Sequence, residues 1–477
     1  MEFCPAGIIC LAICIIITLR RKNFFFNMVL FTAILQIYVE KGFLYKIGTA
    51  EQSLLTPSLL ILTTYSTLNL KKIPIPLQKK WLYLVGCYCV SFILLLLFPS
   101  DAWVATGGDI TWDAIMFKNV APAHPTVNKM ATLLFIMPTL VYLYIYINWK
   151  YIDYKKLLSK LSLISNYFII LGVIEFFTKN VLMLNNIWGD VSLAFWGDTS
   201  STIHAGRLRG LFYESCLFTR EASHYVYSLL CVAIIKLADN IMNNRNKIID
   251  FWIVICLILM LLSTSFASLN MITAFFCIYF AYRWGVRHLT EKKAEILMTG
   301  TFVVMLLLVT SVSSILNIGE GSFIGDRLQN AFDNFGNYMT FDIANGNNID
   351  TYGDGSTYIR TLSVFQTLKV FFDRPFFGYS LGTMFCHGST PTFLAHVGVL
   401  GLICWLNFYL LKCPLKKSLM VCPIPYYIGV IVLLACNFFN SVATSISFYY
   451  FMMPLLFSIT YCFIFQKNEG KRNNNLL

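Results

Sequence analysis

The sequence predicts an all-α, polytopic integral membrane protein, and three observations support this fold class. Of the 477 residues, 57% are hydrophobic and only 13% are charged, which is more apolar surface than a soluble fold of this length can bury. Apolar runs of about 20 residues, the length of a helix that crosses a hydrocarbon core, recur along the whole chain. Basic residues cluster beside these runs, as they do in proteins whose orientation in a membrane is set by charge.

The first apolar run, residues 4–19, is predicted to be a membrane span rather than a cleavable signal. An acidic residue precedes it and three basic residues, Arg20, Arg21 and Lys22, follow it, which reverses the charge order of a signal peptide. The N-terminus is therefore expected outside. In chain order we expect about thirteen spans (range about 11–14), at 4–19, 24–39, 54–70, 81–98, 131–148, 162–177, 222–238, 250–265, 266–282, 296–315, 394–411, 425–441 and 447–465.

The distribution of charge supports this alternation of spans. With the N-terminus outside, the short inward segments and the tail hold 24 of the 36 Lys and Arg residues but only 6 of the 24 acidic residues. This is the bias that the positive-inside rule describes, so the net charge of +12 reflects orientation in the membrane. Binding to nucleic acid is therefore not expected.

The predicted organisation is one membrane domain, residues 1–477, with three long outward segments. These segments, 99–130, 178–221 and 316–393, are the only connections long enough to hold a site, and the last two carry the candidate residues. Most of the 15 cysteines fall in apolar runs, and no CxxC pair with metal spacing occurs. Neither a metal nor a cofactor is expected.

The second outward segment ends in a cluster of ionisable residues, HAGRLRGLFYESCLFTREASHYVYSLL. Its members are His204, Arg207, Arg209, Glu214, Arg220, Glu221 and His224. Planar guanidinium groups that face a water-filled vestibule are suited to bind a diphosphate. The alternative is that these arginines contact lipid phosphates at the membrane surface. Glu175, near the end of the preceding span, is expected either to line a cavity or to reach the interface.

The third outward segment contributes Arg360 and His387. Arg360 precedes TLSVFQTLKVFF, whose apolar positions recur at helical spacing, so we expect it to open an interfacial helix. A loop salt bridge is the alternative role for this arginine. His387 lies at the mouth of the next span, where it is either a structural histidine or a base and phosphate donor.

Together these motifs resemble the bacterial O-antigen polymerase and O-antigen ligase superfamily (Wzy type). RLRGLFYES is similar to the family's Arg-x-x-Gly-x-Phe-x-Glu-Pro-Ser element, with Arg207, Gly210 and Glu214 in register and the proline missing. EASHYV is similar to a variant of the same element. Either Glu214 or Glu221 therefore corresponds to the family's acid.

Two further patterns extend the resemblance. GSTYIRT and the following FFDRPFFGYSLGT are similar to the family's Ser-x-x-x-Arg, helix, Asn-Pro-x-x-Gly-x-Gly stretch, which places Arg360, Pro375 and Gly378 in register. HGSTPTFLAHVGVLG resembles His-Asn-x-x-Leu followed by Glu-x-Gly-x-x-Gly, with His387 and Gly398 in register and a histidine in place of the acid.

The resemblance implies a GT-C-like glycosyltransferase in the inner membrane, active on its periplasmic side. Undecaprenyl-diphosphate-linked glycan would be both donor and acceptor, and no nucleotide sugar would be needed. The leaving lipid diphosphate would be stabilised without metal by four arginines, Arg207, Arg209, Arg220 and Arg360. The acceptor hydroxyl would be activated by one of three candidates, Glu221, Glu214 or His387.

Within the superfamily, the resemblance favours a polymerase of repeat units over a ligase that transfers polymer to lipid A-core. Polymerases are similar in having two long outward segments with one arginine element each, as here. A third alternative is a non-enzymatic flippase or exporter of the same lipid-linked units. Membrane lipids are expected partners, and a chain-length regulator is a further candidate partner.

Overall fold

The computed structural model is mostly helical, which confirms the predicted helical class. Three helices in its described part are long and apolar enough to cross a membrane: α4 (Ile75–Leu97), α7 (Tyr154–Asn180) and α10 (Ala222–Met242). The structure describes residues 2–20, 23–39, 43–47, 50–73, 75–98, 100–103, 122–123, 139–140, 143–144, 148, 151–197, 208–209, 212–219, 222–243, 248–263, 268, 271–272, 275–276, 279, 367–368, 371–380 and 389–409.

The remaining helices are shorter or carry a kink. They are α1 (Pro5–Leu19), α2 (Phe24–Tyr38), α3 (Thr56–Leu68), the 3-10 turn η1 (Leu70–Lys72), α8 (Asn185–Val191), the π-helical turn η4 (Ser192–Trp196), α11 (Phe251–Leu262) and α17 (Ser389–Tyr409). Of the other expected spans, 131–148 and 266–282 are described only in part. Those at 296–315, 425–441 and 447–465 lie outside the described residues.

Helix α7 is longer than the span expected at 162–177. Asp153 caps its N-terminus by accepting a hydrogen bond from the N–H of Lys156 at 3.1 Å. At its other end Glu175 and Lys179 form an ion pair, so the helix continues through both charges. Hydropathy alone underestimates the length of such a helix, because charged residues that are satisfied locally do not end it.

Helix α17 begins at Ser389, inside the segment 316–393 that was expected to be an outward loop. The boundary of that loop is therefore corrected toward the N-terminus. Before it, residues 367–368 and 371–373 are helical, in the stretch where an interfacial helix was predicted. Arg360, at the start of that stretch, lies outside the described residues.

Short antiparallel strands occur in the connections between helices, which the all-α prediction did not include. They are β1 (Glu2–Phe3), β2 (Phe43–Ile47) and β3 (Ala50–Ser53) in one sheet, β4 (Ser100–Trp103) with β5 (Pro122–Ala123), and β6 (Leu208–Arg209) with β7 (Phe212–Tyr213). Strand pairing supplies hydrogen-bond partners to backbone groups where a helix no longer does so.

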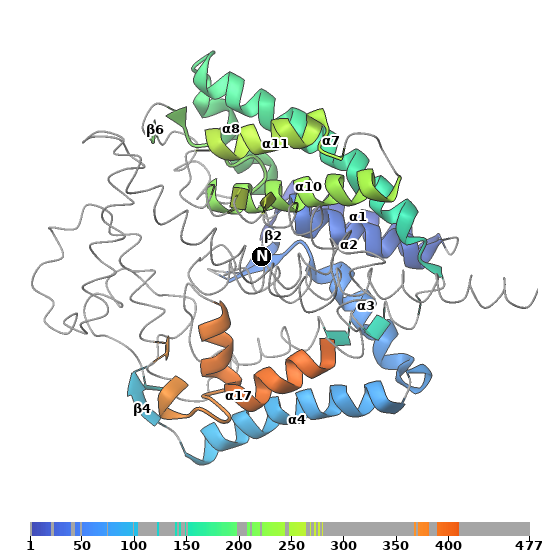
Figure 1. Ribbon diagram of the computed structural model, residues 1–477, viewed down its shortest axis with the longest axis vertical. Helices are drawn as coiled ribbons and strands as arrows, with labels where there is room; N and C mark the ends of the chain where they lie inside the picture. The colour runs from blue at the N-terminus through green and yellow to red at the C-terminus, as the bar shows by residue number, and fades with distance from the viewer. Residues whose placement is uncertain are drawn as a thin grey trace, which may run out of the picture.

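Helix α10 lies at the centre of the main group of helices. It packs against α7 and α11. Of its most apolar 18-residue stretch 89% is buried, compared with 22% for the corresponding stretch of α4. Figure 1 shows α1, α2, α7, α10 and α11 gathered on one side, whereas α4 and α17 lie alongside each other at the opposite edge of the view. The two helices of the second group are far apart in the sequence.

Segments expected on one side of the membrane gather at one end of the helices. The pairing of β1 with β2 brings the N-terminus to the connection that follows α2. Gly197 lies against the ring of Phe43, so the connection that follows α7 lies at the same end as the connection that follows α2. At the ends expected to face inward, Phe25, Tyr65 and Tyr144 form an aromatic cluster with ring centroids 5.1 to 5.8 Å apart.

Candidate functional site

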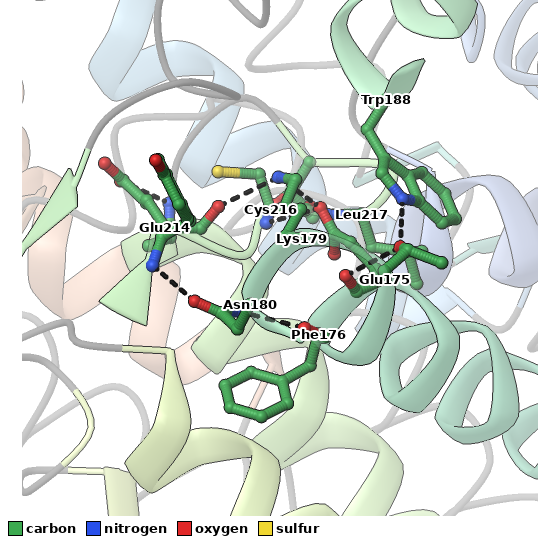
Figure 2. Close-up of polar contacts among 12 residues, drawn as sticks. Glu175, Phe176, Lys179, Asn180, Trp188, Glu214, Cys216 and Leu217 are labelled. Carbon is green, nitrogen blue, oxygen red and sulfur yellow. Dashed lines mark hydrogen bonds and ion pairs between the residues drawn. The ribbon is translucent and has the colours of Figure 1, made fainter. Parts of the chain in front are cut away.

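The first of the three patterns lies against the last turns of α7. Residues 212–219, here called the docked segment, lead from β7 toward the start of α10. Figure 2 shows side chains of α7 directed at this segment. Asn180 Oδ1 accepts a hydrogen bond from the N–H of Tyr213 at 2.6 Å, and Lys179 Nζ donates to the carbonyl of Glu214 at 2.9 Å.

Glu175 accepts two further hydrogen bonds from the docked segment, and Phe176 and Phe168 of α7 pack against the rings of Phe212 and Phe218. Its Oε1 accepts from the N–H of Cys216 at 3.2 Å, and its Oε2 accepts from the N–H of Leu217 at 2.8 Å. Lys179 Nζ donates to Oε1 at 2.8 Å, and both charged side chains are only 1% exposed. Glu175, expected at a cavity or at the interface, is thus buried among groups that satisfy its charge.

The docked segment contains a strained residue that these contacts stabilise. Leu217 has a φ of 43°, in the left-handed region that a branched side chain seldom occupies. Its N–H points at the carboxylate of Glu175. Residues in this region persist where surrounding contacts hold them, and they are frequent at functional sites.

Glu214, one of the two candidate family acids, is buried at the start of α10. Its side chain is 1% exposed, and Oε1 accepts a hydrogen bond from the N–H of Ala222, the first residue of that helix, at 3.2 Å. A carboxylate at this position satisfies an N-terminal N–H group and interacts favourably with the helix dipole. The structure therefore places Glu214 where it orients the entry into α10.

The other predicted site residues fall largely outside the described part of the chain. Arg209 lies in strand β6, where its backbone pairs with Phe212. Five further candidates, Arg207, Arg220, Glu221, Arg360 and His387, lie outside the described residues.

The second and third patterns contact each other directly. Residues 373–380 run along the N-terminal half of α17, and we call this contact the glycine junction. The N–H of Tyr379 donates to the carbonyl of Ala395 at 2.8 Å, and the N–H of Val399 donates to the carbonyl of Pro375 at 2.8 Å. Two stretches of chain are therefore paired through their backbones.

Both glycines of the junction are required by its geometry. Gly398 has φ 65° and ψ −172°, which kinks α17, and Gly378 has a φ of 64°. A Cβ atom at Gly398 would collide with the backbone of Phe376, and one at Gly378 would collide with the carbonyl of Ala395. These are positions at which the sequence matches glycines of the family patterns.

Helix α4 joins the glycine junction through Ser91. Its hydroxyl donates to the carbonyl of His396 at 2.9 Å and accepts from the N–H of Ser380 at 2.9 Å. Ser380, like Leu217, is a non-glycine residue with a positive φ, here 74°. Arg374 adds a hydrogen bond to the carbonyl of Phe98 at 2.6 Å, which also links the junction to the end of α4.

Lys179 and Ser91 are two of the contacting residues that were not foreseen as parts of the site. Lys179 had a detectable signal, because a lysine four residues after a glutamate near the end of an apolar helix is an ion-pair spacing. Ser91 had none, since serine is common in membrane helices. In the part of the chain that the structure describes, no three His, Cys, Asp or Glu side chains are grouped closely enough to hold a metal ion.

Comparison with known proteins does not assign the chain to a family. No family model matches it, and no curated protein shows a significant match.

Proposed function

We propose that this chain is a membrane glycosyltransferase of the O-antigen polymerase type, with a GT-C-like fold of about thirteen spans. It joins undecaprenyl-diphosphate-linked repeat units into a polymer on the periplasmic side of the inner membrane. The anomeric bond to the diphosphate breaks, and a hydroxyl of the acceptor glycan takes the sugar chain. The lipid diphosphate leaves, and the proton of the hydroxyl passes to a base.

The glycine junction is the observation that carries this proposal. The second and third family-like patterns were matched on sequence alone, yet Pro375 and Gly378 of one contact Val399 and Ala395 of the other. Glycine matches that arose by chance would not be expected at the positions where a Cβ atom would collide with the partner pattern.

The contacts of Glu214 refine its part in the proposed reaction. Its carboxylate is buried on the N–H of Ala222, so we assign it a positioning role at the start of α10. Glu221 and His387 are then the candidate bases for the acceptor hydroxyl. Arg207, Arg209, Arg220 and Arg360 are assigned to the donor diphosphate, where charge develops as the bond breaks.

The glycan profile of a deletion strain tests the proposal against its two alternatives. Loss of a polymerase leaves single repeat units on lipid A-core. Loss of a ligase leaves polymer that is not attached to lipid A-core. Loss of a flippase leaves no repeat units outside the cell, and either of the last two profiles would refute the polymerase.

The arginine roles are tested by replacing Arg207 or Arg360 with lysine. Lysine keeps the charge but not the planar pair of donors, so each variant should lose about a hundredfold in polymerisation rate. The measurement is the ratio of polymer to single repeat units at equal protein level. Arg20→Lys, at an exposed arginine after α1, is the matched control and should polymerise normally. Wild-type polymer from both Arg207→Lys and Arg360→Lys would contradict the diphosphate assignment.

A further inference from the structure

We infer that Glu175 and Lys179 are positioning residues for the reaction proposed above, on which this inference rests. Neither residue belongs to a pattern that carries the family resemblance. Both charged groups form hydrogen bonds with each other and with the docked segment. They act through that segment and not by touching substrate.

The chemistry of the pair argues that it does more than stabilise α7. A buried ion pair contributes little net stability, and apolar side chains of similar volume often serve as well. Apolar side chains could not, however, accept the N–H groups of Cys216 and Leu217. Without those acceptors the N–H of Leu217, a residue with positive φ, loses its hydrogen bond to the carboxylate.

Through the docked segment, Glu175 and Lys179 position the residues of the first pattern. The docked segment begins two residues after Gly210 of the first pattern and ends immediately before Arg220 and Glu221. Glu214 lies inside it and holds the start of α10. A shift of about 1 Å in a group that acts on the reacting atoms can cost about a hundredfold in rate, so a fixed docked segment is a requirement of the chemistry.

Exchanging the two charges separates the stabilisation of α7 by the ion pair from the positioning of the docked segment by Glu175. The double variant Glu175→Lys, Lys179→Glu keeps an ion pair at the same spacing but removes the acceptors from position 175. We expect kcat with purified lipid-linked repeat unit to fall about a hundredfold, with KM changed less than about twofold. A defect of stability alone would lower the amount of folded protein and leave kcat per folded molecule unchanged. Retention of kcat within about twofold of wild type would overturn the inference.

A milder variant keeps the test decisive if the exchanged protein does not fold. Glu175→Gln retains one acceptor oxygen and the shape of the side chain, so we expect a kcat loss on the order of tenfold. Lys236→Met is the matched control, because Lys236 is also a buried lysine but bonds to Ser162 far from the docked segment. Its kcat should be that of wild type.

A labelling experiment tests the same inference without any enzyme assay. Cys216 is buried in the docked segment, so its thiol should react slowly with a membrane-impermeant maleimide. Cys386 is the other cysteine in a predicted outward segment, so it is replaced by serine in all variants. In that background Glu175→Gln should speed the reaction of Cys216 on the order of tenfold, because the docked segment opens more often. An unchanged labelling rate would overturn the positioning role. If instead the wild-type protein fails to polymerise repeat units while Glu175→Gln speeds labelling, the proposed function fails and the link between α7 and the docked segment stands.

Discussion

The docked segment and the glycine junction hold irregular backbone in place by different means. Each contains a non-glycine residue with a positive φ, Leu217 or Ser380, whose N–H donates to a side chain of a neighbouring helix. In the docked segment the acceptor is the charged Glu175. In the glycine junction it is the neutral Ser91, and most other contacts there join backbone to backbone.

This difference determines where each region is sensitive to substitution. In the docked segment, the hydrogen bonds of Glu175 go to the backbone N–H groups of Cys216 and Leu217, so they depend on the residue at position 175. In the glycine junction the two backbones approach so closely that the junction residues themselves, Gly378 and Gly398, are constrained. A site can therefore depend on a residue far from its own motif.

Lys179→Met should have the largest effect on stability, because it leaves the carboxylate of Glu175 buried without its cation. We expect the free energy of unfolding to fall by about 3–5 kcal/mol. The measurement is unfolding in detergent, followed by helical circular dichroism. Adding Glu175→Gln to Lys179→Met should recover part of the loss, since no buried charge then remains. Additive losses in the double variant would show that the two residues are not coupled.

Gly398→Ala should have the second-largest effect on stability, and it tests the glycine junction. Alanine at this φ and ψ is strained, and its Cβ meets the backbone of Phe376, so we expect a loss of about 2–4 kcal/mol. Gly86→Ala in α4 is the matched control, because nothing lies within 4 Å of a Cβ there. The control should be neutral or slightly stabilising in the same unfolding measurement. Equal melting temperatures of the two variants would disprove the role of the kink.

Ser91→Ala should have the smallest effect of the three, about 1–2 kcal/mol, because it removes two neutral hydrogen bonds that hold Ser380 and His396. Ser58→Ala provides a comparison, since the buried hydroxyl of Ser58 donates to the carbonyl of Leu55 within the same turn. The difference between the two melting temperatures measures the contribution of the link between helices. A larger loss for Ser58→Ala would mean that Ser91 does not stabilise the junction.

The sequence predicted the helices better than it predicted their ends. Apolar runs located α1, α2 and α3 closely, because burial and helix length leave a direct hydropathy signal. The end of α7 was missed because hydropathy counts Lys179 as a break, although its spacing from Glu175 is that of an ion pair within a helix. Strand β2 was missed although it pairs with the adjacent β3, and only its second pairing, with β1, joins distant parts of the chain.

The candidate site was predictable in the same uneven way. Gly378 and Gly398 were matched by pattern, and the structure supplies the physical reason for both. The contacts of Glu175 with Cys216 and Leu217 join positions 41 and 42 residues apart through backbone N–H groups. Every residue except proline has a backbone N–H, so residue identity does not indicate which acceptor that N–H contacts. No sequence pattern could therefore have indicated these contacts.

The contact of α4 with α17 also has a consequence for synthesis. Ser91 and the carbonyl of His396, which it satisfies, are 305 residues apart. At about 5–20 residues per second, the ribosome needs roughly 15–60 s to make the chain between them. Helix α4 is therefore complete long before its partner exists, and it must remain unpaired at that face until α17 emerges. A ribosome that stalls before Ser389 would leave the hydroxyl of Ser91 without the carbonyl of His396 that it contacts in the folded chain.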